Sequence, residues 1–351
     1  MAFINFQPKD FFTSISYSGN GSNNHAITGV GFAPDYLLTK ETSGARNWYL
    51  ADSVRGTEEE LRPNDTNHTA GDSALMDSFD SDGFTLDDSN SMNSNGSTYY
   101  AACFKGGTTS GITTNGSTVI TPTAYSFNAT SGFAALKYTG NGNTTTKVAH
   151  GLGKVPTMIW IKKTSASGDN WMVYMRGIGN DTAIQLDNTG ATSGGSDRFY
   201  DTTPDTVNFT LGNHTSVNAS GQTYMAYVWC DVPGFSKTGY YKANASSNGP
   251  FIYTGFKPRA LLIKCSSTTS DWSYKDREKV AEAWTSNYNA KVLMLNTTAA
   301  TDTDSTVDFL ANGWKNRDSS SPINTSGETF QWFAWGDQPI VSSNNIPGVA
   351  E

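Results

Sequence analysis

Short apolar runs, each led by a proline and closed by a lysine, recur along the chain. They occupy residues 36–38 after Pro34, 158–161 after Pro156 and 261–263 after Pro258. Apolar runs of this length between such boundaries predict β-strands that are buried on both faces. A tryptophan follows each lysine at nearly constant spacing, and a buried aromatic side chain contributes about 1.5 to 3 kcal/mol. We therefore expect these residues to anchor the interiors of β-sandwiches: Trp48, Trp171 and Trp272.

Other landmarks return in the same order around these runs. Residues 17–21 (YSGNG) reappear as 138–142 (YTGNG) and more loosely as 240–244 (YYKAN). Each copy then closes with an Asn and a Gly before an aromatic strand, which we place at 99–104, 224–229 and 330–335. Asn95-Gly96 predicts a tight type I′ hairpin, because both residues tolerate positive φ. A repeat of about one hundred residues has the size of one small domain.

The predicted fold is therefore all-β, with three tandem antiparallel β-sandwiches of jelly-roll or lectin-like type. One short helix, predicted over 276–288 with Asp276 as its cap, is an insertion in the third copy. Residues 106–132 are rich in Gly, Thr and Ser and predict a linker that adds an edge strand at 118–120. The predicted units are an N-terminal arm (1–12), repeat 1 (13–105), the linker (106–132), repeat 2 (133–234), repeat 3 (235–338) and a C-terminal tail (339–351).

Charge and cysteine content narrow the classes of function. The 351 residues carry a net charge of −8, and only 16% of them are charged. A nucleic-acid or acidic-membrane partner would require a concentrated basic surface, so neither is expected. The three cysteines occupy different positions in the three copies, which predicts buried free thiols. The sequence lacks an apolar run long enough to span a bilayer, and its start does not resemble a signal peptide, so we expect synthesis in a cytoplasm.

Candidate catalytic and metal sites are weak in this sequence. The Asp-rich stretch 77–83 resembles a calcium loop, but the first and twelfth EF-hand positions would fall on Ser78 and Ser89. The four histidines form no recognisable nucleophilic triad, and no nucleophile-elbow or phosphate-loop motif occurs. We therefore predict no catalytic residue, no metal and no cofactor. The pairs Asp52 with Arg55 and Asp276 with Arg277 are interpreted as ion pairs that brace a loop, with ligand contact as the alternative.

Residues peculiar to one copy are better functional candidates, because a shared core does not explain them. Trp284 and Tyr288 lie in the insertion of the third copy, and an exposed aromatic ring there could stack on a sugar. The alternative is a helix packed on its own domain. Arg198 and Tyr200 of the second copy form a second candidate for glycan contact.

The repeated motifs resemble those of tandem-repeat virion proteins of tailed phages, especially marine and cyanobacterial ones. The resemblance covers nearly the whole chain and is carried by the opening stretch 5–12 (NFQPKDFF), 17–21 (YSGNG), 31–35 (GFAPD), 52–56 (DSVRG), 255–258 (GFKP) and the closing Asn-Gly hairpins. It implies a structural role on the particle, at the tail tip, in a fibre or on the capsid exterior. The third copy departs from the pattern, since it lacks the second glycine of the Gly-Asn-Gly turn and carries the insertion.

These observations lead to one main hypothesis and two alternatives. We expect a non-enzymatic virion structural protein at the tail tip or tail fibre, whose arms dock on other virion proteins and whose loops are available to host-surface polysaccharide. The alternatives are a capsid-exterior decoration (cement) protein and a glycan depolymerase. Family analogy implies a homo-oligomer, although no residue pattern selects a symmetry.

Overall fold

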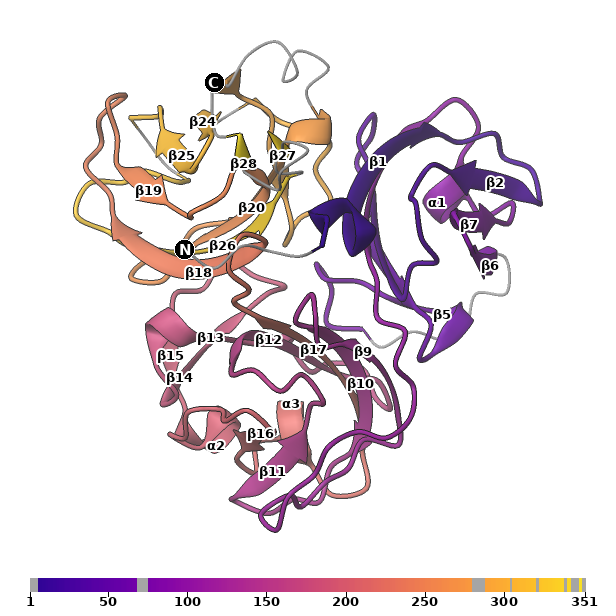
Figure 1. Cartoon of the computed structure of the whole chain (residues 1–351), viewed down its shortest axis with the longest axis vertical. Coiled ribbons are helices and arrows are strands. Elements are labelled where there is room, and N and C mark those ends of the chain that lie inside the picture. Colours follow the sequence, from indigo (N-terminus) through magenta and orange to yellow (C-terminus); the bar gives the residue numbers. More distant parts are fainter. Residues whose placement is uncertain are drawn as a thin grey trace.

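Three lobes surround a common centre in the computed structural model of the chain (Figure 1). The structure describes residues 6–67, 75–279, 288–303, 305–319, 322–337, 340–341 and 347–348. Strands dominate in each lobe, and the described helices are single short turns. The prediction of an all-β chain is confirmed. No helix in these described ranges is long and apolar enough to cross a membrane.

Lobe 1 comprises β1 to β8. Its elements are β1 (Phe12–Ser18), β2 (His25–Thr28), β3 (Tyr36–Glu41), β4 (Trp48–Asp52), β5 (Gly56–Leu61), β6 (Met76–Asp80), β7 (Gly83–Leu86), α1 (Asn90–Asn93) and β8 (Thr98–Phe104), preceded by the 3₁₀ turn η1 (Pro8–Asp10).

Lobe 2 comprises β9 to β17. Its elements are β9 (Ala124–Asn128), β10 (Phe133–Thr139), β11 (Thr146–Ala149), β12 (Pro156–Lys163), β13 (Met172–Met175), η2 (Arg176–Ile178), β14 (Thr182–Gln185), β15 (Ser193–Gly194), α2 (Ser196–Phe199), β16 (Asn208–Leu211), α3 (Thr215–Asn218) and β17 (Thr223–Cys230).

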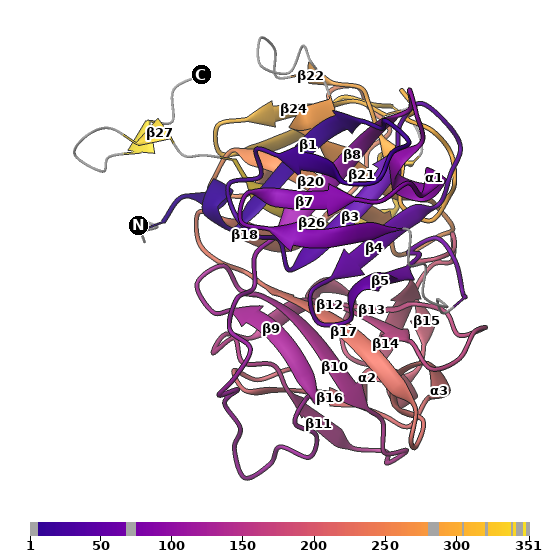
Figure 2. The same ribbon diagram turned by 90° about the vertical axis from the view of Figure 1, so that its right-hand side faces the viewer.

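Lobe 3 comprises β18 to β26. Its elements are β18 (Ser236–Lys242), β19 (Phe251–Tyr253), β20 (Pro258–Cys265), β21 (Trp272–Asp276), η3 (Arg277–Lys279), β22 (Tyr288–Asn289), β23 (Leu293–Met294), β24 (Val307–Leu310), β25 (Gly313–Asn316) and β26 (Thr329–Gly336). A small hairpin of β27 (Ile340–Val341) and β28 (Pro347–Gly348) lies away from the three lobes (Figure 2).

Each lobe contains two antiparallel sheets. The first sheets have the orders β1-β8-β3-β4-β5, β9-β10-β17-β12-β13-β14-β15 and β18-β26-β20-β21-β23. The second sheets are β2-β7-β6, β11-β16 and β19-β25-β24-β22. Register is also shared, since Lys40 pairs with Tyr100, Lys162 with Met225 and Lys264 with Gln331.

The central strands of the first sheets are buried on both faces, as the apolar runs predicted. All residues of β3 and β12 are buried. Side chains alternate between the two faces of a strand, so Leu37 packs in the core of lobe 1 while Leu38 enters a central core formed by all three lobes. Lobes 2 and 3 have their own separate cores as well. The three lobes thus share one apolar centre in addition to a core of their own.

The recurring tryptophans are buried as predicted, but their place differs from the prediction. Trp48, Trp171 and Trp272 are fully buried in the central core and not inside a single sandwich. Their strands β4, β13 and β21 turn these side chains toward the neighbouring lobes. The apolar pattern of a strand indicates that both of its faces are covered. It does not indicate which part of the chain covers each face.

Several segments outside the repeats also pack onto the body of the protein. In the predicted linker, β9 pairs with β10, and Ile120 forms a parallel bridge with Val148 instead of an edge strand at 118–120. In the predicted N-terminal arm, Phe6 and Phe11 pack against the central core, and the ring of Phe6 lies 5.7 Å from that of Phe235. The three cysteines are free and buried, as expected.

The predicted helix over 276–288 begins at the expected place, as a 3₁₀ turn, and does not end as expected. Asp276 ends strand β21, a single 3₁₀ turn follows at η3, and Tyr288 begins strand β22. Residues 280–287, including Trp284, lie outside the described residues. Although it is buried in the sheet, Asp276 caps the turn η3 as predicted, because its carboxylate accepts a bond from the Glu278 amide at 2.7 Å.

The Asn-Gly turns are present, although Asn95-Gly96 is not a type I′ hairpin. Gly96 has a φ of 77°, whereas Asn95 is not among the residues with positive φ. The amide of Ser97 donates to the carbonyl of Ser94 at 3.1 Å, as in a type II turn with Gly at its third position. The turn leads from the second sheet into β8 of the first, so it crosses the sandwich and does not join two paired strands.

The asparagine that closes each copy is buried, and its side chain hydrogen-bonds to another turn of the same copy. We call these bonds the asparagine tie. In lobe 2, Asn218 accepts a bond from the amide of Asn141 at 2.9 Å and donates to the carbonyls of Asn143 at 3.0 Å and Gly212 at 2.9 Å. The same tie is made in lobes 1 and 3 by Asn93 and Asn324. An amide side chain with both donor and acceptor groups is needed at this place.

Replacing Gly327 with valine is expected to destabilise the protein by about 1 to 3 kcal/mol. The space around the new side chain is open, so the cost comes from its φ of 77°, which a β-branched residue rarely adopts. Urea unfolding measures the change. Gly116→Val is the matched control, because Gly116 is also in open space without positive φ. Equal stability of the two variants would contradict the turn assignment.

Candidate functional site

The lobes are joined by three buried lysines at equivalent positions of β3, β12 and β20. Each ammonium group donates to a threonine carbonyl of a neighbouring lobe, and the bonds run in one direction around the centre. Lobe 1 thereby contacts lobe 3, lobe 3 contacts lobe 2, and lobe 2 contacts lobe 1. The bonds are Lys40 Nζ to Thr298 O at 3.2 Å, Lys162 Nζ to Thr66 O at 2.7 Å and Lys264 Nζ to Thr189 O at 2.9 Å.

The recurring tryptophans form a second set of bonds between the same pairs of lobes. Each indole N–H donates to a backbone carbonyl four residues before the threonine of the lysine bond. These bonds are Trp48 Nε1 to Met294 O at 2.9 Å, Trp171 Nε1 to Arg62 O at 3.0 Å and Trp272 Nε1 to Gln185 O at 2.9 Å. We call the six bonds the inter-lobe ring. A buried indole N–H requires such a partner.

Burial in the inter-lobe ring changes the proton affinity of the lysines. It lowers the pKa of Lys40, Lys162 and Lys264 to about 8, although the carbonyl acceptors favour the charged form. In the unfolded chain a lysine has a pKa of about 10.4. At a pH between these two pKa values, the three lysines therefore bind more protons in the unfolded state than in the folded state.

The free energy of unfolding is expected to rise with pH between about 8 and 9 for this reason. Above about pH 9 the buried tyrosines and Cys103, whose pKa values burial raises, oppose the lysines, because in the unfolded chain they lose protons that the folded protein keeps. Each lysine adds a slope of at most about 1.4 kcal/mol per pH unit. Urea unfolding at a series of pH values measures the slope. Lys162→Met should remove one lysine's share of it. An equal slope in the wild-type protein and in Lys162→Met over pH 8 to 9 would contradict the lowered pKa of this lysine.

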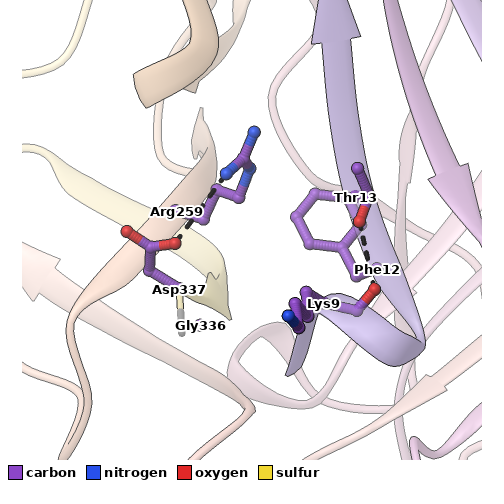
Figure 3. A pocket seen from close by; sticks show the side chains of 6 residues that line it. All are labelled: Lys9, Phe12, Thr13, Arg259, Gly336 and Asp337. Atoms are coloured by element: carbon purple, nitrogen blue, oxygen red, sulfur yellow. Dashed lines mark hydrogen bonds and ion pairs between the residues drawn. The ribbon is translucent and has the colours of Figure 1, made fainter. Parts of the chain in front are cut away.

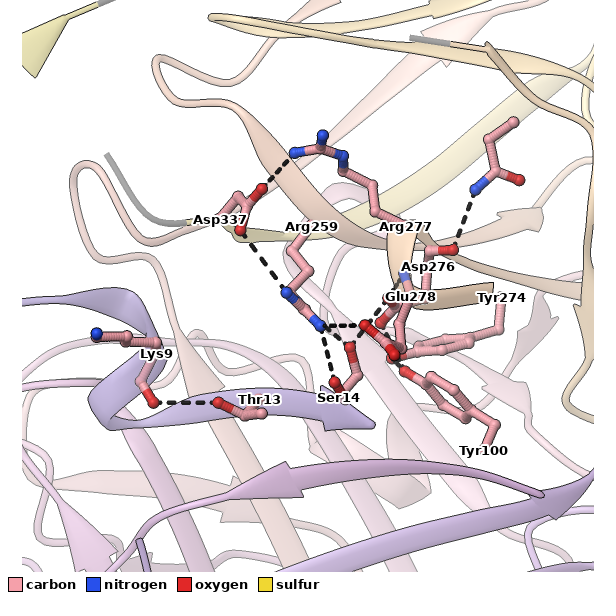
Figure 4. A network of polar contacts seen from close by, with 11 residues as sticks. Lys9, Thr13, Ser14, Tyr100, Arg259, Tyr274, Asp276, Arg277, Glu278 and Asp337 are labelled. Carbon is pink, nitrogen blue, oxygen red and sulfur yellow. Dashed lines mark hydrogen bonds and ion pairs between the residues drawn. The ribbon is translucent and has the colours of Figure 1, made fainter. Parts of the chain in front are cut away.

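A polar network joins lobes 1 and 3 beside the inter-lobe ring (Figure 4). Asp276, which is fully buried, accepts bonds from Tyr100 at 2.6 Å and from Ser14 at 3.0 Å. Arg259 donates to the Ser14 hydroxyl at 2.8 Å, and Tyr274 lies 2.7 Å from Tyr100 between the two hydroxyl oxygens. Burial raises the pKa of the Asp276 carboxyl. Every group of this network is engaged by protein, so it ties two lobes together.

The predicted loop-bracing ion pairs are correct for one copy only. Asp52 and Arg55 are buried and pair at 2.6 Å, and Tyr227 of lobe 2 also donates to Asp52 at 2.6 Å. Asp276, in contrast, does not brace a loop with Arg277, which pairs with Asp337. The two aspartates nevertheless share one feature. Each ends a strand at the boundary between lobes and accepts a hydrogen bond from a tyrosine hydroxyl of another lobe.

A small pocket lies between lobes 1 and 3, beside this network (Figure 3). It is lined by Lys9, Phe12, Thr13, Arg259, Gly336 and Asp337. Its volume has room for about one water molecule. The Arg259 and Asp337 side chains at its wall are 3.8 Å apart and pair with each other. This pocket is too small for a saccharide or nucleotide substrate.

His25 and His150 take structural positions. His25 Nδ1 lies 2.7 Å from Asn93 Oδ1, and His150, whose pKa is lowered by burial, contacts the Asp205 carbonyl and the Leu152 amide. Within the described ranges no group of three metal-binding side chains occurs. In the Asp-rich stretch, Asp82 accepts bonds from the amides of Gly29 and Gly31 and so stabilises a turn.

One family model matches almost the whole chain. It is described as a domain of unknown function, DUF7483, and it matches residues 7–339. The chain belongs to the DUF7483 family. Comparison with curated proteins and with solved structures gives no significant match. In this DUF7483 protein the matched range includes all three lobes and the complete inter-lobe ring.

The described glycan-contact candidates of the DUF7483 protein lie in two lobes. Tyr288 is exposed on β22 of lobe 3, and Trp284 is outside the described residues. Arg198 and Tyr200 belong to lobe 2, where Arg198 pairs with its neighbour Asp197 at 3.2 Å and Tyr200 is an exposed left-handed residue after α2. Tyr288 on the one hand, and Arg198 and Tyr200 on the other, thus lie in different lobes, as the two separate candidates did in the sequence.

Sequence reasoning missed two groups of residues. One is the set of threonines that accept the lysine bonds, which follow an Asn or Asp by two positions in every copy: Asn64 and Thr66, Asp187 and Thr189, Asn296 and Thr298. The other is a pair of exposed aromatics, Phe251 and Tyr253, on β19. A comparison of the copies around Ile252 and Ile27 would have revealed them, because lobe 1 has small residues at the flanking positions.

Proposed function

We propose that this DUF7483 protein is a non-enzymatic structural component of a tailed-phage virion, located at the tail tip or a tail fibre. Three tandem copies of one jelly-roll-like, lectin-like sandwich form its body in this proposal. Other virion proteins are its partners, a homo-oligomer is expected, and its surface contacts host polysaccharide.

The inter-lobe ring is the observation that supports a structural role most strongly. Its buried cations and indoles bond to backbone carbonyls of the next lobe. The lysine and tryptophan side chains of the ring thus hold lobes together. The pocket between lobes 1 and 3 has room for only about one water molecule. A rigid block of this kind suits a particle component, and the resemblance of the motifs to tandem-repeat virion proteins supplies the phage context.

Mass spectrometry of purified particles, with an antibody against this protein, tests the proposal. We expect the protein in the particles at a fixed stoichiometry, with immunogold label at the tail. Label on the shell would support the decoration role instead. Absence from washed particles whose host lysate contains the protein would contradict a virion role.

A further inference from the structure

The outer face of the second sheet of lobe 3 carries a row of large side chains. This sheet, β19-β25-β24-β22, lies on the side of lobe 3 that is turned away from the common centre (Figure 1). Phe251 pairs with Lys315, Lys315 with Asp308, and Asp308 with Tyr288, so these four residues cross the sheet in one line. With about 4.8 Å between neighbouring strands, the row is roughly 14 Å long.

The aromatic rings of this face are open to solvent. Phe251 is 49% exposed, Tyr253 59% and Tyr288 53%. Tyr253 pairs with Gly313, where a side chain would meet the Phe251 ring at 3.1 Å, so the missing side chain leaves that flank of Phe251 uncovered. Between Phe251 and Tyr253, Ile252 points inward to the core of lobe 3 and holds the strand in place. We call Phe251, Tyr253, Tyr288, Lys315 and Lys237 the aromatic face.

The equivalent positions in the other lobes show that the fold does not require these rings. Ile27 of lobe 1 occupies the place of Ile252, opposite Phe84 as Ile252 is opposite Trp314. The residues that flank Ile27 are Ala26 and Thr28. In lobe 2 the flanking residues of β11 are Lys147 and Ala149, and the segment around Ile120 lies alongside that strand. Large exposed aromatics are therefore a property of lobe 3 alone among the second sheets.

The aromatic face also carries positive charge on an acidic protein. Lys315 Nζ donates to the Asn248 side chain at 2.6 Å, and Lys237 Nζ donates to the Tyr253 carbonyl at 3.1 Å and lies 4.9 Å from the centre of its ring. Both ammonium groups thus have neutral acceptors in the described part of the chain. Asp308, the acid in the row, pairs with Arg317 at 2.6 Å. The whole chain has a net charge of −8. Lys315 and Lys237 make this face locally positive, and it is therefore complementary to an anion.

We propose that the aromatic face binds an acidic polysaccharide across the strands of lobe 3. The apolar faces of the sugar rings stack on Phe251, Tyr253 and Tyr288, which are rigid and lose little entropy on binding. A carboxylate or sulfate of the sugar pairs with Lys315 and Lys237. This inference deepens the host-glycan part of the proposed function and names the ligand class.

Native gel electrophoresis in gels cast with sodium alginate, a polyuronate, tests the proposal on the full chain. We expect the wild-type protein to be retarded in alginate and not in neutral dextran. The double variant Phe251→Ala and Tyr253→Thr copies lobe 1 and should fold normally, yet bind alginate at least about tenfold more weakly. Lys315→Thr, which copies Thr85 of lobe 1, should weaken binding and reduce its dependence on salt.

Tyr240→Thr is the matched control, because Tyr240 is an exposed aromatic of the same lobe on the first sheet. Its neighbour Tyr241 faces the core of lobe 3, so the Tyr240 side chain points away from the aromatic face. This variant should bind as the wild type does. Unchanged retardation of the double variant, equal retardation in dextran or none in alginate would overturn the proposal. The proposal would also be overturned if the wild-type protein were a dimer and the double variant a monomer, because a second copy of the chain would then cover the aromatic face. None of these outcomes affects the virion test, which depends on particles alone.

Discussion

Replacing Trp171 with alanine is expected to lower the free energy of unfolding by about 3 to 5 kcal/mol. The indole is fully buried in the central core and stacks on Tyr227, with 6.3 Å between the ring centres. It also donates to Arg62 O of lobe 1 at 3.0 Å and lies 6.0 Å from the Lys162 ammonium group. The substitution therefore opens a cavity where two lobes meet. Urea unfolding followed by circular dichroism measures the loss.

Trp171→Phe separates the inter-lobe bond from the packing. It retains most of the ring volume and removes the N–H donor, so the Arg62 carbonyl loses its partner at a cost of about 1 to 2 kcal/mol. A loss below about 0.5 kcal/mol for both variants, which is the scatter of surface substitutions, would contradict the place of Trp171 in a shared core.

Replacing Asn218 with alanine should destabilise the protein by about 3 kcal/mol. The change removes the acceptor for the Asn141 amide and the donor for the carbonyls of Asn143 and Gly212, which come from the connection after β10 and from the residue after β16. Three backbone groups would lose their partner in a place that water reaches poorly, because Asn218 is fully buried. Thermal unfolding by calorimetry measures the effect.

Asn143→Ala is the control for this prediction. Asn143 is exposed in the same pair of turns, and the bond to Asn218 uses its backbone carbonyl, which alanine retains. Its stability should change by less than about 0.5 kcal/mol. Similar losses for the two variants would indicate that the turns tolerate any side chain and that the asparagine tie is not important.

The local structure could be predicted from the sequence because its signals are local. Apolar runs of constant length predicted that β3, β12 and β20 are buried on both faces, and the glycines of the closing turns predicted positive φ. The prediction of a type I′ hairpin at Asn95-Gly96 was wrong. Turn residues indicate that the chain reverses, and they do not indicate which sheet the next strand joins. Asp276 both ends the strand that pairs with β20 and caps the turn η3, and Tyr288 begins a strand where the helical pattern was expected to end.

The central core could not be predicted, because it depends on contacts between distant segments. Leu37 and Leu38 look alike in the sequence, yet one faces lobe 1 and the other faces all three lobes. Of the candidate glycan contacts, Tyr288 lies in the proposed face, and its neighbours there come from β19 and β25. Such a face becomes visible only when the register of four strands is known.

Calorimetric unfolding of the full chain tests most directly whether the three lobes form one cooperative unit around a shared centre. The account predicts a single transition, in which the calorimetric and van't Hoff enthalpies agree and which Trp171→Ala moves as a whole to lower temperature. Two or three separate transitions, of which Trp171→Ala moves only the one that belongs to lobe 2, would contradict it.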